Sequence, residues 1–555
     1  MKKVLAMLLA LAMVATLFVG CGKKEEPAPE QQTEKEEKEP AATEAPAEPV
    51  NLTYGITNDW NSLNYFAAAP VAASNIVQEK IFDKLFYICA DGSIKARNAE
   101  SWEFNEDNTV LTIKLNKAAK WHDGEAVTAE DWLFTFQTLC SEEAGFAKAT
   151  NSKHLAGTDD NGYFTDAEAF GVKALDDYTL ELTFKDNMLS LENMLQKTQF
   201  GYLTVIPKHI LGELTPGEVV TDETFWNAPV GSGPCKFVSH VVNNELVLEA
   251  NPDYYLGAPK FATLTFKKMD AATSLATFES AGDIDVVFPR YNSDNAIEAL
   301  TTCEASGFVV DQDAAPTRIC YVLINNTNVD DVRIRQAIQL TIDRKALCET
   351  VMAGLAVPTA TFVTDANPNK KSDIDITPDL EKAAALLKEA GYDTTNRLAL
   401  TMDTVAGFRA TIAAYMQQEC AKIGIDITVN TTDVATGFAD ISSGAVDMAW
   451  IVDNTKNTNL YADWYYLANN EGSYTCVTDT SFQEKMDAIK ELEKAGDAAA
   501  LKTAMYEFQD YIYEQAPIIP LFFMYGVNAH SARISNATLE DAVGWNDNCW
   551  EWVVE

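Results

Sequence analysis

Two distant stretches of the chain repeat the same alternation of apolar and polar positions, in the order strand, helix, strand. The segments are 264–266, 271–280 and 283–288 in the first stretch, and 425–429, 434–443 and 446–451 in the second. Aligning Gly282 with Gly444 places Asp285 on Asp447. This order is typical of a βαβ unit, whose crossover favours a parallel sheet. Two such units far apart predict two α/β lobes.

Elsewhere in the chain, the pattern of apolar and polar positions predicts both strands and helices. Alternation between 104 and 115 and between 178 and 184 predicts antiparallel strands, and therefore a β-rich region early in the chain. Thr128 with Asp131 has the spacing of a capping box before a helix. Apolar periodicity predicts further helices at 331–342, 344–352, 377–391, 482–495 and 498–515, followed by one buried strand at 518–527.

The N-terminus has a different pattern from the rest. Lys2 and Lys3 precede an apolar run, 4–19, that is too short to span a membrane and fits a secretory signal. The run ends at Cys21, and Phe18-Val19-Gly20-Cys21 resembles a bacterial lipobox, in which the cysteine is diacylated and becomes the mature N-terminus. An ordinary cleaved signal with a chance cysteine is the alternative. Residues 22–48 lack aromatic and branched aliphatic side chains, which predicts a solvated linker.

Composition narrows the class of function. The net charge of -40 argues against nucleic-acid binding, which relies on lysine and arginine. The 10 cysteines show no C-x-x-C spacing, and the five histidines show no paired metal spacing, so we predict buried free thiols and neither a zinc site nor a cofactor. No G-x-S-x-G elbow and no P-loop occur, so an enzyme is not predicted.

A series of ordered motifs resembles the extracytoplasmic solute-binding proteins of peptide ABC transporters, the dipeptide and oligopeptide class (solute-binding protein family 5). The resemblance runs from about 51 to 523. Its motifs are Ser62-Leu63-Asn64, Ile81-Phe82-Asp83-Lys84-Leu85, Ala99-Glu100-Ser101-Trp102, Trp121-His122-Asp123-Gly124, Pro229 to Pro234, Asn251-Pro252-Asp253-Tyr254-Tyr255, Asp331 to Ile338 and Ala383 to Tyr392.

The resemblance implies a fold class: α/β, with the two-lobed architecture of type II periplasmic binding proteins and an extra inserted β-rich domain. The implied boundaries are a signal peptide at 1–20, the lipidated cysteine and linker at 21–49, lobe I at 50–82, 195–312 and 526–555, the inserted domain at 83–194 and lobe II at 313–525. Hinges are expected near 317–323 and 520–525. Lobe closure around a ligand is the expected motion.

The binding residues follow from the same resemblance. Trp450-Ile451-Val452-Asp453 resembles the family's Trp-x-x-Asp, in which the aspartate pairs with a peptide's α-ammonium and the tryptophan forms a wall of the pocket. The position of Asp453 after a strand fits ligand binding outside the carboxyl ends of strands. Asn454 and Tyr461 are further candidates. The alternative without a binding role is that Trp450 belongs to the hydrophobic core and Asp453 caps a turn. Asp447 stands where some relatives carry an arginine, so the holder of a ligand's carboxylate is open.

The implied function is capture of extracellular peptides by a monomeric, lipid-anchored protein on the outer face of the cell membrane, and their delivery to ABC permease subunits. An oligosaccharide or a metal chelate as ligand, or a peptide-sensing receptor, are the alternatives within this architecture. A secreted hydrolase is the alternative from a different class, and it would need a nucleophile–base pair or a metal cluster.

Overall fold

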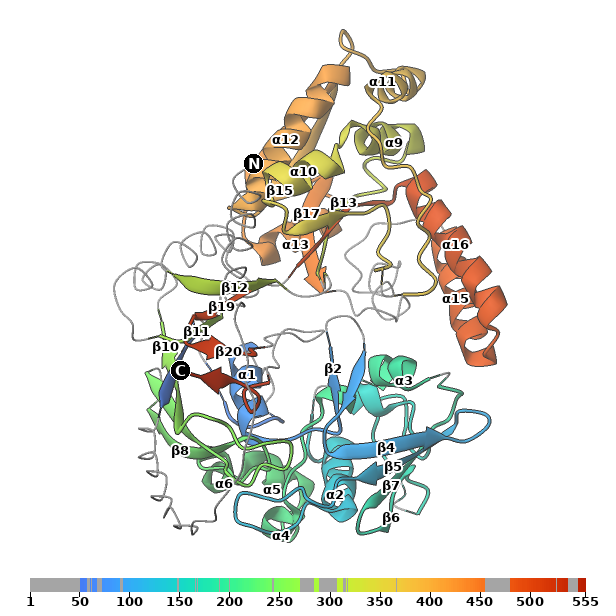
Figure 1. Cartoon of the computed structure of the whole chain (residues 1–555). Helices are drawn as coiled ribbons and strands as arrows, with labels where there is room; N and C mark the ends of the chain where they lie inside the picture. The colour runs from blue at the N-terminus through green and yellow to red at the C-terminus, as the bar shows by residue number, and fades with distance from the viewer. Residues whose placement is uncertain are drawn as a thin grey trace, which may run out of the picture. The chain divides into compact units, whose positions relative to one another are not determined.

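The computed structural model describes residues 50–555 with gaps. The gaps are 57–59, 61, 67–71, 90–92, 147–148, 165, 167, 189, 199, 242–243, 270–283, 289–306, 313–315, 317, 366, 455–479, 526 and 538–547. The predicted signal, Cys21 and linker, and Tyr461, therefore lie outside the described residues. Three larger β-sheets organise the described residues (Figure 1).

The first sheet has seven strands in the order β12-β19-β11-β1-β10-β9-β8. The central strand β1 runs parallel to both β10 and β11, and the outer pairs are antiparallel. In sheet order the bounds are Phe308–Gln312, Val527–Ser531, Val286–Phe288, Asn51–Ile56, Thr263–Lys268, Glu245–Ala250 and Cys235–Val241.

The second sheet has six strands in the order β14-β18-β13-β17-β15-β16. Here β15 runs parallel to β16 and β17, and β13 is antiparallel to β17 and β18. In sheet order the bounds are Ala356–Pro358, Ile518–Met524, Arg318–Ile324, Met448–Asn454, Leu398–Thr404 and Ile425–Thr431. Its helices are α9 (Val332–Thr341), α10 (Arg344–Thr350), α11 (Leu380–Glu389), α12 (Phe408–Ile423), α13 (Val434–Ser443), α15 (Thr480–Ala495) and α16 (Ala498–Gln515).

Alternate side chains of β13 belong to two different cores. Cys320, Val322 and Ile324 pack into one hydrophobic cluster, and Ile319, Tyr321 and Leu323 pack into the other. Since successive side chains of a strand point to opposite faces, the second sheet is buried on both faces. This burial explains why β13 is an unbroken apolar run, unlike a strand with one wet face.

The third sheet is antiparallel, in the order β4-β5-β7-β6, which confirms the predicted β-rich region. Its bounds are Ala99–Phe104, Val110–Leu115, Thr179–Thr183 and Val172–Asp176. The helices of this region are α1 (Ala72–Ile81), α2 (Ala129–Leu139), α3 (Leu191–Thr198), α4 (Lys208–Leu211), α5 (Pro216–Thr221) and α6 (Glu223–Asn227), with 3-10 turns at Ala149–Ser152 and Phe200–Tyr202. Two small pairs are β2 (Phe86–Ile88) with β3 (Ile94–Ala96) and β20 (Ile534–Ser535) with β21 (Val553–Val554).

The strands of the internal repeat found in the sequence are present in the sheets, whereas the helix predicted at 271–280 lies outside the described residues. In both sheets the two strands of the repeat flank a third strand that is parallel to both: β1 lies between β10 and β11, and β15 lies between β16 and β17. The two aligned aspartates make equivalent hydrogen bonds. Asp285 Oδ2 accepts a hydrogen bond from the Thr53 N–H at 2.8 Å, and Asp447 Oδ2 accepts one from the Thr401 N–H at 2.8 Å. Each carboxylate thus holds the inserted central strand.

The chain passes between the first and second sheets twice within the described strands. It leaves β12 at Gln312 and enters β13 at Arg318; it leaves β18 at Met524 and enters β19 at Val527. The prediction of one strand over 518–527 is therefore wrong, because an apolar run does not reveal a change of pairing partner. The predicted domain boundaries stay a prediction; the second sheet takes its strands from 318–524 and the third from 99–183.

Candidate functional site

The carboxyl ends of β15, β16 and β17 meet at one edge of the second sheet. Thr404 is level with Thr431, and Asp403 is level with Ala449. We call residues 403–404, 431–432 and 450–454 the carboxyl edge. Ligands of open α/β sheets bind outside such strand ends, where helix N-termini also gather. The described part of this edge is therefore the candidate binding site.

Trp450 lies at this edge but is part of the core. Its side chain is only 4% exposed, and its ring meets Phe408 edge-on with centroids 6.3 Å apart. The indole Nε1 is buried and has no hydrogen-bond partner among the described residues. The ring is therefore part of the hydrophobic cluster of the second sheet, while its single N–H donor has no partner among the described residues; whether Trp450 also contacts a ligand stays a prediction.

Asp453 and Asn454 are the last paired residues of β17. Their partners on β13 are Ile319 and Arg318. Because Thr404 ends β15 one residue past Asp403, Asp453 lies three residues beyond the end of β15, ~10 Å further along the strand direction. The register thus puts the backbone of both candidates on a part of β17 that projects past its parallel neighbour.

Asp403 and Thr432 were not predicted from the sequence. Asp403 is 2% exposed, and its Oδ1 accepts a hydrogen bond from Asn430 Nδ2 at 3.1 Å. The Thr432 Oγ1 is buried without a hydrogen-bond partner among the described residues, whereas the Asp403 carboxyl group is within hydrogen-bonding reach of the Asp440 carboxyl group. Burial, with the neighbouring Asp440 carboxyl group, raises the pKa of Asp403, although the Asn430 bond acts against this. A buried hydroxyl without a partner, such as that of Thr432 just past the end of β16, marks a place where a ligand or an ordered water can complete the bonding.

Two helices begin beside this edge. α12 starts at Phe408, four residues after β15 ends, and α13 starts at Val434, capped by the Asp433 side chain. The Arg409 guanidinium lies 5.2 Å from the Phe408 ring centroid. Burial raises the pKa of the Cys320 thiol well above its ordinary value, and the positive charges of Arg409 and Arg318 oppose that effect. Positive charge therefore reaches the same end of the sheet as Asp453.

Other site chemistry is sparse in the described part of the chain. It contains no group of three His, Cys, Asp or Glu side chains placed to hold a metal ion. None of its helices combines the length and the apolar character needed to cross a membrane. The described cysteines are buried free thiols, as predicted: Cys89, Cys140, Cys235, Cys320, Cys348, Cys420 and Cys549.

Comparison with known proteins identifies the family. The family model of the bacterial extracellular solute-binding proteins, family 5 Middle, matches residues 93–475. The oligopeptide-binding protein AppA of Bacillus subtilis is 24% identical over 487 residues, with 84% of each chain covered. An ABC transporter peptide-binding protein of Brucella melitensis is 29% identical over 351 residues, which are 61% of this chain and 60% of that protein. The chain therefore matches only about three fifths of the length of this relative.

A solved structure shows the same fold. The ABC transporter substrate-binding protein CtaP of Listeria monocytogenes has a TM-score of 0.77 at 22% identity, with 91% of this chain and 99% of that chain covered. AppA of Bacillus subtilis, solved with a nonapeptide, has a TM-score of 0.65 at 20% identity, with 91% and 100% covered. The predicted fold class, α/β and two-lobed like the periplasmic binding proteins, is confirmed.

Proposed function

Since the chain belongs to the bacterial extracellular solute-binding proteins of family 5, we propose that it binds peptides outside the cytoplasm and presents them to an ABC importer. Asp453 anchors the peptide's α-ammonium. The observation that carries this proposal is the position of Asp453 at the projecting carboxyl end of β17, in a chain whose relative AppA is named an oligopeptide-binding protein. A carboxylate facing a desolvated ammonium forms a charge-assisted hydrogen bond, the strong kind.

The peptide's carboxylate has a candidate partner in Arg409. This residue stands in the first turn of α12, a 16-residue helix whose N-terminus favours anions. The Phe408 ring lies near both residues: its centroid is 5.2 Å from the Arg409 guanidinium carbon and 6.3 Å from the Trp450 ring centroid. Arg409 thus replaces, in role, the arginine that some relatives carry where this chain has Asp447.

The anchoring proposal is tested by calorimetry with free and Nα-acetylated forms of the same peptides. We expect acetylation to weaken binding at least tenfold, and Asp453→Asn to do the same, because removing one partner of a buried charge pair costs about 2–5 kcal/mol. The two losses should not add, since both remove one interaction. The matched control is Asp426→Asn, an exposed carboxylate on β16 that pairs with Arg397 and should leave affinity unchanged.

Two results would count against the proposal. Equal affinity for acetylated and free peptides would remove the ammonium role of Asp453. Tight binding of an oligosaccharide or a metal chelate that is insensitive to Asp453→Asn would favour the alternatives within the same architecture. Uptake assays in a strain lacking the permease would separate delivery to a transporter from peptide sensing.

The same proposal includes a lipid anchor at Cys21, preceded by Phe18-Val19-Gly20. Its support is the short apolar run and the charged linker that follows. A diacylated cysteine would give firm membrane attachment, since two chains bury many methylene groups. Intact-mass spectrometry of protein extracted from its host should show a diacylglyceryl adduct at the N-terminus, and Cys21→Ser should release the protein from membranes. An unmodified N-terminus further into the linker would point to ordinary cleavage instead.

A further inference from the structure

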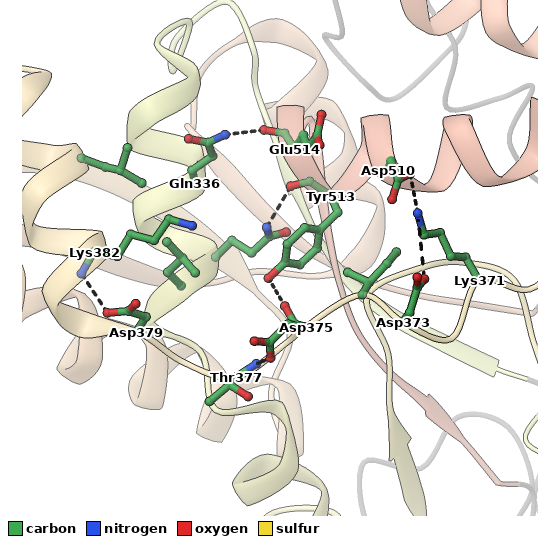
Figure 2. Close-up of a pocket in the computed structure, with 14 residues that line it drawn as sticks. Gln336, Lys371, Asp373, Asp375, Thr377, Asp379, Lys382, Asp510, Tyr513 and Glu514 are labelled. Atoms are coloured by element: carbon green, nitrogen blue, oxygen red, sulfur yellow. Dashed lines mark hydrogen bonds and ion pairs between the residues drawn. The ribbon is translucent and has the colours of Figure 1, made fainter.

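A hollow lies among helices that pack around the second sheet, and none of its lining residues belongs to the carboxyl edge. It has a volume of about 390 Å³ and is bounded by α9, α11, the end of α16 and the segment 371–379 (Figure 2). The α16 end is fixed there by two glutamines of α9: Gln336 Nε2 donates to the Glu514 carbonyl at 2.6 Å, and Gln339 Nε2 donates to the Tyr513 carbonyl at 3.0 Å.

Gln339 leaves an acceptor without a donor. Its side chain is 2% exposed and lines the hollow, and its Oε1 is buried with no hydrogen-bond partner among the described residues. The amide orientation is fixed, because its nitrogen must face the Tyr513 carbonyl. A buried acceptor without a donor is destabilising, so a fold that keeps one offers a place where a ligand or an ordered water can donate.

The charge of the hollow is negative. Five carboxylates line it, against two lysines. Lys371 already pairs with Asp510 at 2.6 Å and lies 3.9 Å from Asp373. Lys382 is exposed. Asp375, Asp379 and Glu514 are the remaining acids, and Figure 2 shows the side chains of Asp375 and Glu514 on either side of the Tyr513 ring. The lining as a whole carries a charge of about -3, which favours a cation.

The cation that fits is organic. The described residues hold no cluster of three metal-ligating side chains, here or elsewhere. The hollow instead offers one aromatic ring, Tyr513, and the aliphatic side chains of Leu340, Ile374 and Leu386. Such walls suit methylene groups, and an aromatic face attracts an ammonium group. Its volume is within the range of small-molecule sites.

We propose that this hollow binds an aliphatic ammonium ion, whose N–H donates to Gln339 Oε1 while its methylene chain lies against Tyr513 and the neighbouring aliphatic side chains. The carboxylates of Asp375 and Glu514 supply the balancing charge. The ammonium group has two possible sources, a free diamine or polyamine and the side chain of a lysine. This site is separate from the peptide site proposed at the carboxyl edge, and it does not depend on that proposal.

The test is calorimetry on the full-length protein with putrescine, spermidine and Nα-acetyl-lysine amide, and with 1,4-butanediol as the uncharged analogue of putrescine. We expect saturable binding of at least one amine and none of the diol. Gln339→Met should weaken amine binding about tenfold or more. The matched control is Gln417→Met on α12, which also removes a bond from a helical glutamine to a backbone carbonyl, that of Ile427 at 2.6 Å, but does not line the hollow; it should leave amine affinity within about twofold.

A second variant keeps the test independent of folding at the buried glutamine. Glu514→Gln changes an exposed side chain of the lining and should weaken amine binding severalfold, more at low salt than at high salt. Binding of the free amines but not of the capped lysine would assign the site to polyamines, and the reverse would assign it to lysine side chains. No saturable binding of any amine up to about 10 mM, or amine binding unchanged in Gln339→Met, would overturn the proposal.

Discussion

His122 joins two turns that lie far apart in the sequence. Its Nδ1 accepts a hydrogen bond from the Gly231 N–H at 3.2 Å, and its Nε2 is 3.1 Å from the Gly233 carbonyl oxygen, which requires a neutral ring with its proton on Nε2. Burial lowers the pKa of His122 from 6.5 to about 4, against the opposing effect of the Gly233 bond. The ring therefore resists protonation only while the protein is folded.

This difference predicts a pH dependence of stability. Above pH 6.5 the ring is neutral in both states, so the folded state keeps the full contribution. Between pH 6.5 and 4 the unfolded chain takes up a proton that the folded chain does not, so the free energy of unfolding falls as the pH falls, by on the order of 3 kcal/mol in total from this group. Urea unfolding at a series of pH values from 7 to 4 measures it.

The comparison variant is His122→Gln, whose amide can still donate to the Gly233 carbonyl but does not titrate. We expect it to be less stable than the wild type at pH 7 and to lose less stability on acidification. Equal slopes for the two proteins between pH 6.5 and 4 would mean that His122 titrates alike in both states.

The sequence located some residues of the candidate site and missed others for a physical reason. Asp453 was expected just beyond an apolar strand, and the structure instead makes it the last residue but one of β17, so the sequence located the strand but ended it too early. Asp403 also ends a strand, but its interest comes from Asn430 and Asp440, which only the fold brings near it. Gln339 is one of many helical glutamines until its carbonyl oxygen is seen to be buried without a partner. A one-dimensional pattern does not contain such contacts.

At the level of elements, two glycines end neighbouring helices in different surroundings. Gly424 after α12 has φ of 110°, and a Cβ there would lie 2.4 Å from the Asp393 carbonyl carbon and oxygen. Gly391 after α11 has φ of 96°, with nothing within 4 Å of a Cβ. Both positions suit glycine for the backbone angle alone, but only the first also needs the missing side chain.

We therefore expect Gly391→Ala to cost about 1 kcal/mol of stability, the usual cost of a left-handed backbone for alanine, and Gly424→Ala to cost at least about 2 kcal/mol more, because backbone atoms must move. Denaturant unfolding of the two variants side by side measures the difference. Similar losses for both would show that the turn at Asp393 yields easily.

Helices were predicted more accurately than sheet pairings. Helix α13 has the predicted bounds, and Thr128 N donates to the Asp131 carboxylate at 2.8 Å as the capping box requires. The helix expected from Thr377 instead begins at Leu380 with Asp379 as its cap, since that side chain accepts from the Lys382 N–H at 2.8 Å. Periodicity reports which face is buried, but capping is decided by single hydrogen bonds.

On the scale of the whole molecule, the net charge of -40 predicts an unusual response to salt. Self-repulsion among so many acidic groups destabilises the compact state, and dissolved ions screen it. We expect the melting temperature to rise between 10 and 500 mM sodium chloride, by about 1 °C for each kcal/mol of repulsion removed, because the entropy of unfolding grows with chain length. Calorimetry with sodium chloride, repeated with potassium chloride to exclude a specific ion effect, measures it. A falling melting temperature would mean that attractive ion pairs outweigh the repulsion.

The strands that flank the two connections between the first and second sheets are paired, and this pairing has a practical consequence. Arg318 and Met524 are direct partners on β13 and β18, so the second sheet begins and ends within one strand spacing, about 5 Å. Gln312 and Val527 are likewise partners on β12 and β19. The segment from Arg318 to Met524 is thus a cassette with adjoining ends: it could be exchanged for that of a relative, or replaced by a two-residue hairpin turn, without stretching the backbone of the strands that remain.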